Sequence, residues 1–531
     1  MQLIFGIFVY PLIDYMPRRS RIVVLIIFFS FYFFVSFSQD RRTKRRKNKI
    51  ELVQTDGALE KVKINGESYQ KITGPNLVFR QGSTYYYCDE AYYSKKKNTL
   101  EASGSVQIKD STLTIVGKKL IYDGNSKVAQ IRQDITLTNQ SMKLYTQYLD
   151  YRIGDNTATY FNGGKIIDDS TILTSRNGFV DQDNNYVLFT DSVVVINPSF
   201  KIFTDHLTYH LLTKEAICTG PTRIVNDKGE ETYTTYIKYN TKTKVTSLDK
   251  GSRIEGADYQ FFGDKIVYDD KKQITRAEKN VKLVSKKESI VIEGDNGFND
   301  KKKGVTRVYG KVLMLSPMDQ DTLYITADTL LAVDSGDPKQ KRMVAYHHVK
   351  MYKSDLQGAC DSLVYRFSDS TIHFYRNPIL WSEGSQMVAD SMYAELKNKK
   401  LDKLHLRVNP LIISQDSVQN FNQLKGKNMV ALFGQGKIRR VDVYGNGESI
   451  YFAVDQDTIT MGMNRITCSN MFIHFDERGK IHRISFLSSP DGRFIPPHEL
   501  SEPDKKLKGF KWRIMEQPIR QEVVGKRRKV S

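Results

Sequence analysis

A tyrosine returns at a nearly constant interval along most of this chain. Tyr93, Tyr122 and Tyr151 are 29 residues apart, and the interval resumes from Tyr209 to Tyr268. Sequence periods of about 20 to 50 residues are typical of stacked repeat proteins, in which each copy packs mainly on its neighbours. The interval therefore predicts an array of similar units rather than one irregular globular core.

Each copy has the composition of a strand, a turn and a second strand. In the first copy, residues 88–93 lead through the polar turn 95–98 into residues 100–108, and residues 117–123 open the next copy. About a dozen such copies follow one another between residues 75 and 486, with longer spacings after residue 300. If each copy adds one strand to each of two sheets, the stack grows by about 4.8 Å per copy.

The strand assignment rests on alternation of apolar and polar side chains. Residues 106–109, 135–138 and 349–351 alternate strictly, which on a pleated strand turns every apolar side chain to one face. Thr, Tyr, Val and Ile are frequent, and proline is scarce, with 14 in 531 residues. No part of the repeat region shows a helical stripe. The sequence thus predicts an all-β array with one apolar face per strand turned inward.

The amino terminus predicts export. Residues 16–21 are basic, residues 22–37 are rich in Ile, Val and Phe, and Ser36-Phe37-Ser38 fits a small-x-small cleavage site. We interpret residues 1–38 as a signal peptide. An uncleaved inner-membrane anchor is the alternative, because the basic run 41–47 follows at once.

Net charge and cysteine spacing restrict the kinds of binding partner and metal or redox site that the chain can have. The formal net charge of +20 suggests an anionic partner, and outside the cytoplasm this means membrane phosphates or an acidic glycan rather than nucleic acid. Solvated basic tails are the simpler explanation of much of the excess. The four cysteines lie more than 100 residues apart, which excludes a CxxC metal or redox motif and favours buried free thiols. No metal or other cofactor is expected.

Several motifs resemble the OstA-like family of lipopolysaccharide-transport proteins. The copies open with a small residue, Asp, three residues and Tyr, as in 263–268 and 360–365, and close as in 102–108. The later segments 423–429 and 443–451 are similar to those of long Bacteroidetes-type members. The resemblance covers roughly residues 50 to 515. The family includes the periplasmic bridge protein and the amino-terminal domain of the outer-membrane translocon.

The resemblance implies an elongated, twisted β-jelly roll with an apolar slit that holds the acyl chains of lipid A. It implies a periplasmic protein that bridges the inner and outer membranes. Open edge strands at the two ends of the array would pair with other lipopolysaccharide-transport proteins, and capped edges are the alternative. This chain is longer than the short bridging members and ends without the barrel of the translocon. The inward apolar side chains are candidates for the slit lining and would equally be core positions in any version of the fold: Val106, Ile108, Ile135, Leu137, Val349 and Met351.

Two other functions compete with lipid transport. A structural or adhesive scaffold would have a filled interior and a binding face outside. A polysaccharide-active enzyme would need clustered carboxylates, whereas Asp89, Asp123, Asp264, Asp361 and Asp390 recur at a fixed point of the repeat or its turn. Turn chemistry explains such aspartates better. We expect no enzymatic activity and no catalytic residues.

The expected organisation along the chain follows from these segments. The export segment 1–38 precedes a basic linker, 39–60. Two halves of the repeat array occupy 61–300 and 301–488. A proline-containing cap and basic tail, 489–531, complete the chain.

Overall fold

Antiparallel strands account for nearly all of the regular structure, and the all-β prediction is confirmed. The computed structural model describes residues 49–525 apart from 111–112, 140–141, 169, 288, 319–320, 399, 457 and 478–480. The expected export segment 1–38, residues 39–48 of the basic linker and the basic end 526–529 lie outside these residues, whereas residues 49–60 of the linker are described and include β1 and the start of β2. The helical elements are short: η1 (Pro497–Glu499), η2 (Ile514–Glu516) and α2 (Arg520–Val524).

The chain divides into two compact units, and the division lies between Lys250 and Gly251, within β17 (Val245–Glu255). The strands that precede β17 belong to unit 1: β1 (Glu51–Gln54), β2 (Ala58–Ile64), β3 (Glu67–Gln81), β4 (Thr84–Ser94), β5 (Thr99–Lys109), β6 (Thr114–Asp123), β7 (Val128–Asn139), β8 (Met142–Arg152), β9 (Thr157–Tyr160), β10 (Gly164–Asp168), β11 (Thr171–Ser175), β12 (Asn177–Asp181), β13 (Tyr186–Asn197), β14 (Phe200–His210), β15 (Glu215–Asn226) and β16 (Glu231–Asn240).

Unit 2 contains the remaining strands: β18 (Tyr259–Asp269), β19 (Ile274–Ser285), β20 (Val291–Asp300), β21 (Val305–Met318), β22 (Asp321–Val333), β23 (Arg342–Lys353), β24 (Leu356–Arg366), β25 (Thr371–Tyr375), β26 (Ile379–Ser382), β27 (Ser385–Val388), β28 (Ser391–Lys397), β29 (Lys400–Arg407), β30 (Leu411–Gln415), β31 (Phe421–Lys425), β32 (Asn428–Gly434), β33 (Lys437–Asp455), β34 (Ile459–Phe475), β35 (Ile481–Leu487) and β36 (Asp491–Ile495).

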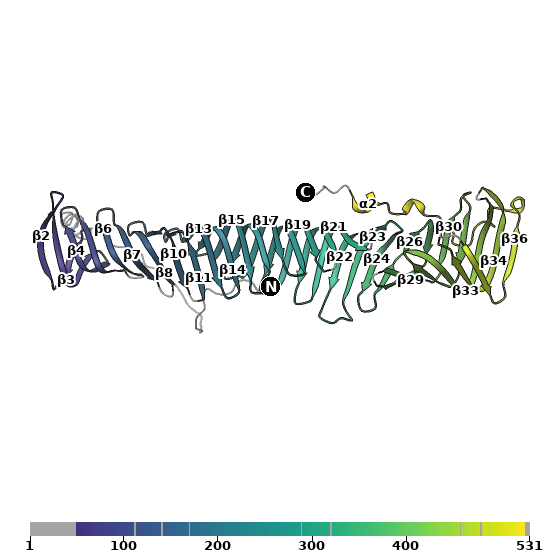
Figure 1. Ribbon diagram of the computed structural model, residues 1–531, viewed down its shortest axis with the longest axis horizontal. Coiled ribbons are helices and arrows are strands. Elements are labelled where there is room, and N and C mark those ends of the chain that lie inside the picture. The colour runs from purple at the N-terminus through teal and green to yellow at the C-terminus, as the bar shows by residue number, and fades with distance from the viewer. Residues whose placement is uncertain are drawn as a thin grey trace, which may run out of the picture. The chain divides into compact units, whose positions relative to one another are not determined.

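Successive long strands pair as hairpins, so β3 to β8 are neighbours in chain order (Figure 1). The polar segments between them form tight turns. Asp123 accepts hydrogen bonds there from the Asn125 backbone N–H at 2.8 Å and from Ser126 Oγ at 2.9 Å. Lys127, which ends this turn, has a φ of +57°. The turn chemistry expected for Asp123 is therefore present.

Each long strand bends at a two-residue corner in its middle. The hydrogen-bonding register breaks between Ser103 and Val106 on β5 and at the matching point of each neighbouring strand. Short polar side chains bridge one corner to the next: Asp89 accepts from the Ser105 backbone N–H at 2.7 Å, and Asp264 accepts from Asn280 Nδ2 at 2.7 Å. Asp361 and Asp390 occupy equivalent positions and bond His347 and Asn409. These four aspartates serve the corners, not the hairpin turns.

The corners divide the strands of unit 1 into two walls. The first wall contains the halves 84–87, 106–109, 114–117 and 135–139 of β4 to β7, and the second wall contains the halves 90–94, 99–103, 119–123 and 128–132. Every long strand contributes to both walls. The expectation of one strand per sheet in each copy is therefore wrong: each copy adds two strand segments to each wall.

The repeated tyrosines fill the space between the walls. Tyr122 of the second wall stacks on Tyr86 of the first, with ring centroids 4.7 Å apart, and Tyr93 packs on Phe79 at 5.5 Å. Along the second wall Leu100 separates Tyr93 from Tyr122. The rings thus pair across the interior.

The cysteines are buried within the unit to which each belongs. Cys88, Cys218, Cys360 and Cys468 are all buried free thiols, as the sequence predicts.

Candidate functional site

Four of the six predicted lining residues lie side by side on the first wall of unit 1. Ile108 is opposite Ile115, which is opposite Leu137. Val106 is opposite Gly117, and a Cβ at Gly117 would lie 3.5 Å from Cγ1 of Ile135. All four side chains are inward and buried, with exposed fractions between 0% and 8%.

The interior at these residues is occupied by side chains of the same unit. Tyr86 and Tyr122 are each 1% exposed, and the Tyr122 hydroxyl donates a hydrogen bond to Oε1 of Gln81. Gln81 also donates from Nε2 to the Gly124 carbonyl at 2.9 Å. An acyl chain would enter this part of unit 1 only if the walls moved apart.

The two other predicted residues lie on the corresponding wall of unit 2. Val349 and Met351 are 1% and 4% exposed and belong to a large buried cluster. Met351 is opposite Gly358, which is opposite Leu380. A Cβ at Gly358 would lie 2.5 Å from Leu380 Cδ2 and 3.0 Å from Met351 Cγ. The close packing of Met351 and Leu380 therefore requires a glycine at position 358.

Unit 2 also contains a small, partly open cavity of about 70 Å³ between two sets of strands. One side consists of the aliphatic residues Ile438, Val441, Ile473 and Ile484. The other side is more polar and comes from β27, β30, β31 and β33: Ser385, Ile412, Ser414, Asn422, Leu424, Ser449 and Tyr451. The volume is smaller than the cavity of about 150 Å³ that accepts a benzene ring.

Sequence reasoning missed this cavity because its polar residues do not follow the predicted alternation. The one available signal is the run Leu411-Ile412-Ile413, in which three consecutive side chains are buried. Three buried neighbours on a strand indicate that both faces are covered. The alternation of apolar and polar residues selects only strands that are covered on one face.

Hydroxyl groups line the inward side of the corners in the later strands of unit 1. Thr204 and Thr222 share a hydrogen bond of 2.9 Å, and Thr222 donates to the Gly220 carbonyl at 3.0 Å. Thr234 donates to the Tyr236 carbonyl at 2.9 Å, and Thr146 donates to the Gly163 carbonyl at 2.7 Å. These hydroxyls satisfy carbonyl groups that the corners remove from the strand ladder.

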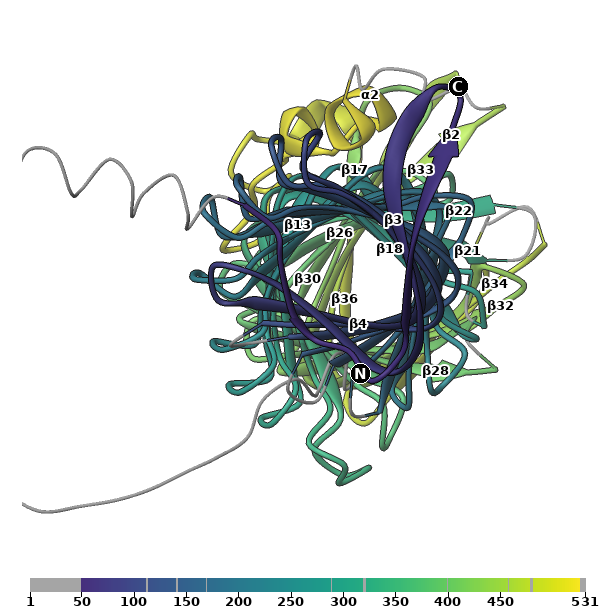
Figure 2. The same cartoon turned by 90° about the vertical axis from the view of Figure 1, so that its left-hand side faces the viewer.

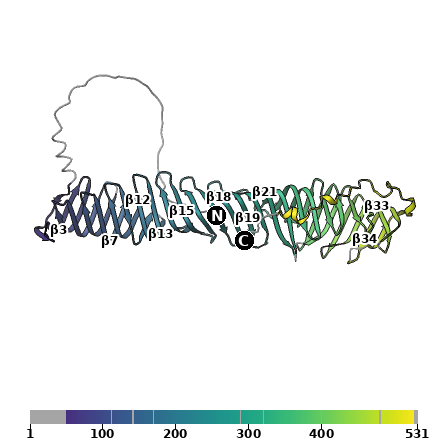
Figure 3. The same ribbon diagram turned by 90° about the horizontal axis from the view of Figure 1, so that it is seen from above.

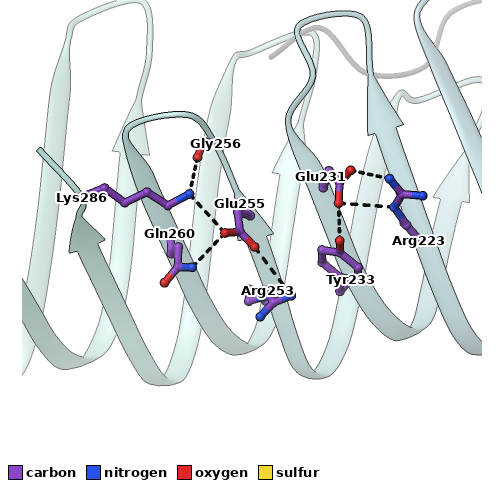
Figure 4. A network of polar contacts seen from close by, with 8 residues as sticks. All are labelled: Arg223, Glu231, Tyr233, Arg253, Glu255, Gly256, Gln260 and Lys286. Atoms are coloured by element: carbon purple, nitrogen blue, oxygen red, sulfur yellow. Dashed lines mark hydrogen bonds and ion pairs between the residues drawn. The ribbon is translucent and has the colours of Figure 1, made fainter.

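Charged groups gather instead on the outer surface, where they pair with one another (Figure 4). In unit 1, Arg223 binds Glu231, which also accepts from the Tyr233 hydroxyl. In unit 2, hydrogen bonds from Gln260 and Lys286 lower the pKa of Glu255. These exposed pairs are surface structure and do not form a cleft with clustered carboxylates.

No group of three or more His, Cys, Asp or Glu side chains in the described part of the chain could hold a metal ion. The described residues also contain no helix long and apolar enough to cross a membrane. The apolar segment 22–37 lies outside them.

Each unit has an open strand edge. In unit 1, β2 pairs only with β3 among the described strands, and Leu59 and Ile64 on β2 are 48% and 41% exposed. In unit 2, β35 and β36 both pair with β34 alone among the described strands, and Phe494 on β36 is 53% exposed. Open edges of this kind offer unpaired backbone groups to another strand.

Comparisons with known proteins agree with the fold. Residues 47–205 match the model of the OstA-like protein family, and residues 291–400 match the model of the LptA/(LptD N-terminal domain) LPS transport proteins. No curated protein matches the sequence.

One similar solved structure is LptH from Pseudomonas aeruginosa, the LptA homologous periplasmic component of a lipopolysaccharide transport device. It is 20% identical over 20% of this chain and 81% of LptH, with a TM-score of 0.19. A TM-score this low does not establish a shared fold. The two matched family segments, with the tyrosine repeat and the all-β walls, show that this chain belongs to the OstA-like family.

Proposed function

We propose that this protein carries lipopolysaccharide through the periplasm toward the outer membrane, with the acyl chains held between its two walls. The observation that carries the proposal is the inward, buried apolar surface of the first wall in unit 1, which includes Val106, Ile108, Ile135 and Leu137. These four residues lie within a segment that matches the OstA-like family.

Apolar walls suit a cargo that has to move. Burial of a methylene group is worth about 0.8 kcal/mol and has no directional requirement. A lipid with several acyl chains would therefore be held firmly without being fixed at one position along the wall. The closed packing around Tyr86 and Tyr122 requires the walls to separate as the lipid enters.

Bridging would use the open edges. β2 in unit 1 and the β35–β36 edge in unit 2 would each pair with a strand of another transport protein. Exposed apolar side chains beside both edges, such as Leu59 and Phe494, would be buried by that pairing. The matches to models of lipopolysaccharide-transport families support a periplasmic location.

A structural or adhesive scaffold is the second candidate, and the filled interior of unit 1 favours it. Photo-crosslinking separates the two functions. A photoreactive phenylalanine would replace Ile108 or Ile135 in a lipopolysaccharide-producing host, and the outward neighbours Gln107 and Thr136 would serve as matched controls.

Lipopolysaccharide adducts at the inward positions and not at the outward ones would support the carrier. Equal labelling of both sets, or no labelling at any position while the protein remains folded, would favour the scaffold.

A further inference from the structure

The carboxyl-terminal residues 500–525 form a strap over the outer face of unit 2. They follow β36 and η1 and run back across the strands toward α2, as the yellow segment shows in Figures 1 and 3. Figure 2 shows α2 outside the strands rather than between them. The strap is therefore an external element that covers one wall of its own unit.

Hydrogen bonds and ion pairs join the strap to many of the strands that it crosses. The contacts come from β22, β23, β24, β27, β31 and β34, and they run in order along the strap: Lys350 with Glu522, Tyr324 with Arg520, Gln357 with Gln517, Gln386 with Lys511 and Arg513, Gln423 with Lys505 and Leu507, and Arg465 with Asp504. The contacts of the strap thus extend across unit 2 from β22 to β34.

Two buried glutamines hold the strap backbone in the manner of a paired strand. Gln386 donates from Nε2 to the Lys511 carbonyl at 2.7 Å and accepts from the Arg513 backbone N–H at 2.6 Å. Gln423 donates to the Lys505 carbonyl at 2.7 Å and accepts from the Leu507 N–H at 2.8 Å. Both glutamines are 0% exposed, so displacement of the strap would leave their amide groups without these partners.

Apolar contacts complete the interface. Phe421 packs on Phe510 and on Trp512 of the strap, each with ring centroids 5.3 Å apart. Leu507 is 2% exposed and lies in a cluster with Ile413 and Ile450. Trp381 is opposite both Gln357 and Gln386 in the same row of the wall and is 1% exposed.

The strands beneath the strap also form one side of the cavity in unit 2. Successive residues on a strand face opposite ways, so Ile413 faces the strap while Ile412 and Ser414 line the cavity. Ser449 lines the cavity beside Ile450, and Gln423, which binds the strap, is itself among the lining residues. Any outward movement of this wall would have to displace the strap.

We propose that the strap is a brace that keeps the wall of this cavity closed, with Gln386 and Gln423 as its positioning residues. Release of the strap lets the wall yield and admits an acyl chain into unit 2. The inference rests on the lipid-carrying function proposed above. It is tested separately, because the crosslinks at Ile108 and Ile135 are in unit 1 and do not involve the strap.

The test uses the full chain with two kinds of variant. Gln386→Met with Gln423→Met keeps the side-chain volume and removes all four backbone contacts. Gln340→Met, at an exposed glutamine of unit 2, is the matched control. In the opposite direction, Gln357→Cys with Gln517→Cys joined by a short bismaleimide would lock the strap, because these side chains meet at 2.6 Å in the native protein.

Two measurements report on each variant. The two tryptophans of the chain, Trp381 and Trp512, lie on opposite sides of the strap interface, so acrylamide quenching of their fluorescence measures strap release. A diazirine-bearing palmitic acid measures entry into the cavity, with adducts mapped by mass spectrometry to residues 438–441 and 473–484.

Loss of the four buried contacts should shift the strap equilibrium by roughly ten-fold or more. We expect quenching and cavity labelling to rise together in the double Met variant, to stay unchanged in Gln340→Met, and to fall in the locked protein relative to its untreated form. Released strap without increased labelling would overturn the proposal, as would unchanged quenching. If the double Met variant does not fold, equal labelling of the locked and untreated proteins overturns it on its own.

Discussion

At the scale of single residues, the interior of this protein depends on a few polar atoms with fixed partners. In the later strands of unit 1, Thr204, Thr222 and Thr234 face inward and are 4% to 6% exposed. Thr222 and Thr234 donate to carbonyl groups next to the corners. A buried carbonyl group without a hydrogen-bond donor destabilises the folded state by its full desolvation free energy. These hydroxyls therefore stabilise the bend of the strands at the corners.

Thr222→Val tests this role because valine has nearly the same shape and no hydroxyl. Loss of the bonds to Thr204 and to the Gly220 carbonyl should destabilise the protein by about 1–3 kcal/mol, measured as a lower midpoint of urea unfolding. Thr219→Val, at an exposed position of the same strand β15, is the control. Equal effects of the two substitutions would contradict a special role for the inward hydroxyl.

The buried thiols give a second prediction at this scale. Burial raises the pKa values of Cys88, Cys218 and Cys360 to about 12. Because the thiolate is the reactive form, a raised pKa leaves almost none of it at about pH 8. Native protein should therefore react slowly with Ellman's reagent, and all four cysteines should react once the chain is unfolded in denaturant. Rapid reaction of the native protein would show that the walls open readily.

At the scale of elements, the corner is the feature that turns a strand into part of two walls. Lys279 and Asn280 at the corner of β19 have φ values of +59° and +51°, which residues other than Gly, Asn and Asp adopt at a cost. Asn280 suits this conformation and also donates to Asp264 of the neighbouring corner at 2.7 Å. The corners thus need particular residues, while the strand halves need only alternation.

Asn280→Val should destabilise unit 2 by about 1–2 kcal/mol, because a β-branched side chain is strained in the left-handed region. Asn280→Gly, which tolerates this φ, should cost less. Lys282→Val on the same strand is the control, since valine is favoured in a regular strand and the exposed ion pair of Lys282 with Glu293 contributes little. Thermal unfolding would rank the three variants by their midpoint temperatures. An Asn280→Gly variant less stable than Asn280→Val would contradict the strain argument.

At the scale of the whole molecule, the excess of basic residues governs long-range interactions. The formal net charge is +20 and the pI is about 9.4. Many described basic residues, such as Arg223 and Lys286, are neutralised locally by carboxylates. Such pairs leave the net charge unchanged, because the value of +20 is already the difference between 80 basic and 60 acidic residues, and the sequence of the basic end 526–529 contributes four of the positive charges.

The charge predicts salt-sensitive binding to anionic membranes. Protein should float with phosphatidylglycerol vesicles at low salt and not with phosphatidylcholine vesicles. Binding should be lost near 1 M salt, where the Debye length falls to about 3 Å. Replacement of Lys526, Arg527, Arg528 and Lys529 by alanine separates the contribution of the tail from that of the strands. Equal flotation with both kinds of vesicle would exclude an electrostatic origin.

The candidate lining was predictable because it depends on a local pattern. Val106 and Ile108 alternate with outward residues, and a strand has only two faces. The structure shows these side chains as inward and buried; whether they touch lipid stays a prediction. The cavity of unit 2 was not predictable, because Ser385 and Ser414 face inward on strands whose other face is covered by a distant segment.

The sequence by itself determined the strand and turn repeat, the all-β class and the inward set of side chains, because each follows from neighbours a few residues apart. Tertiary structure alone decided the rest. The corners form where bends on adjacent strands coincide, the open edges depend on which strands lack a partner, and the strap joins Gln386 to Arg513 across 127 residues of chain. Contacts between residues so far apart leave no periodic trace in the sequence, since only the folded backbone brings them together.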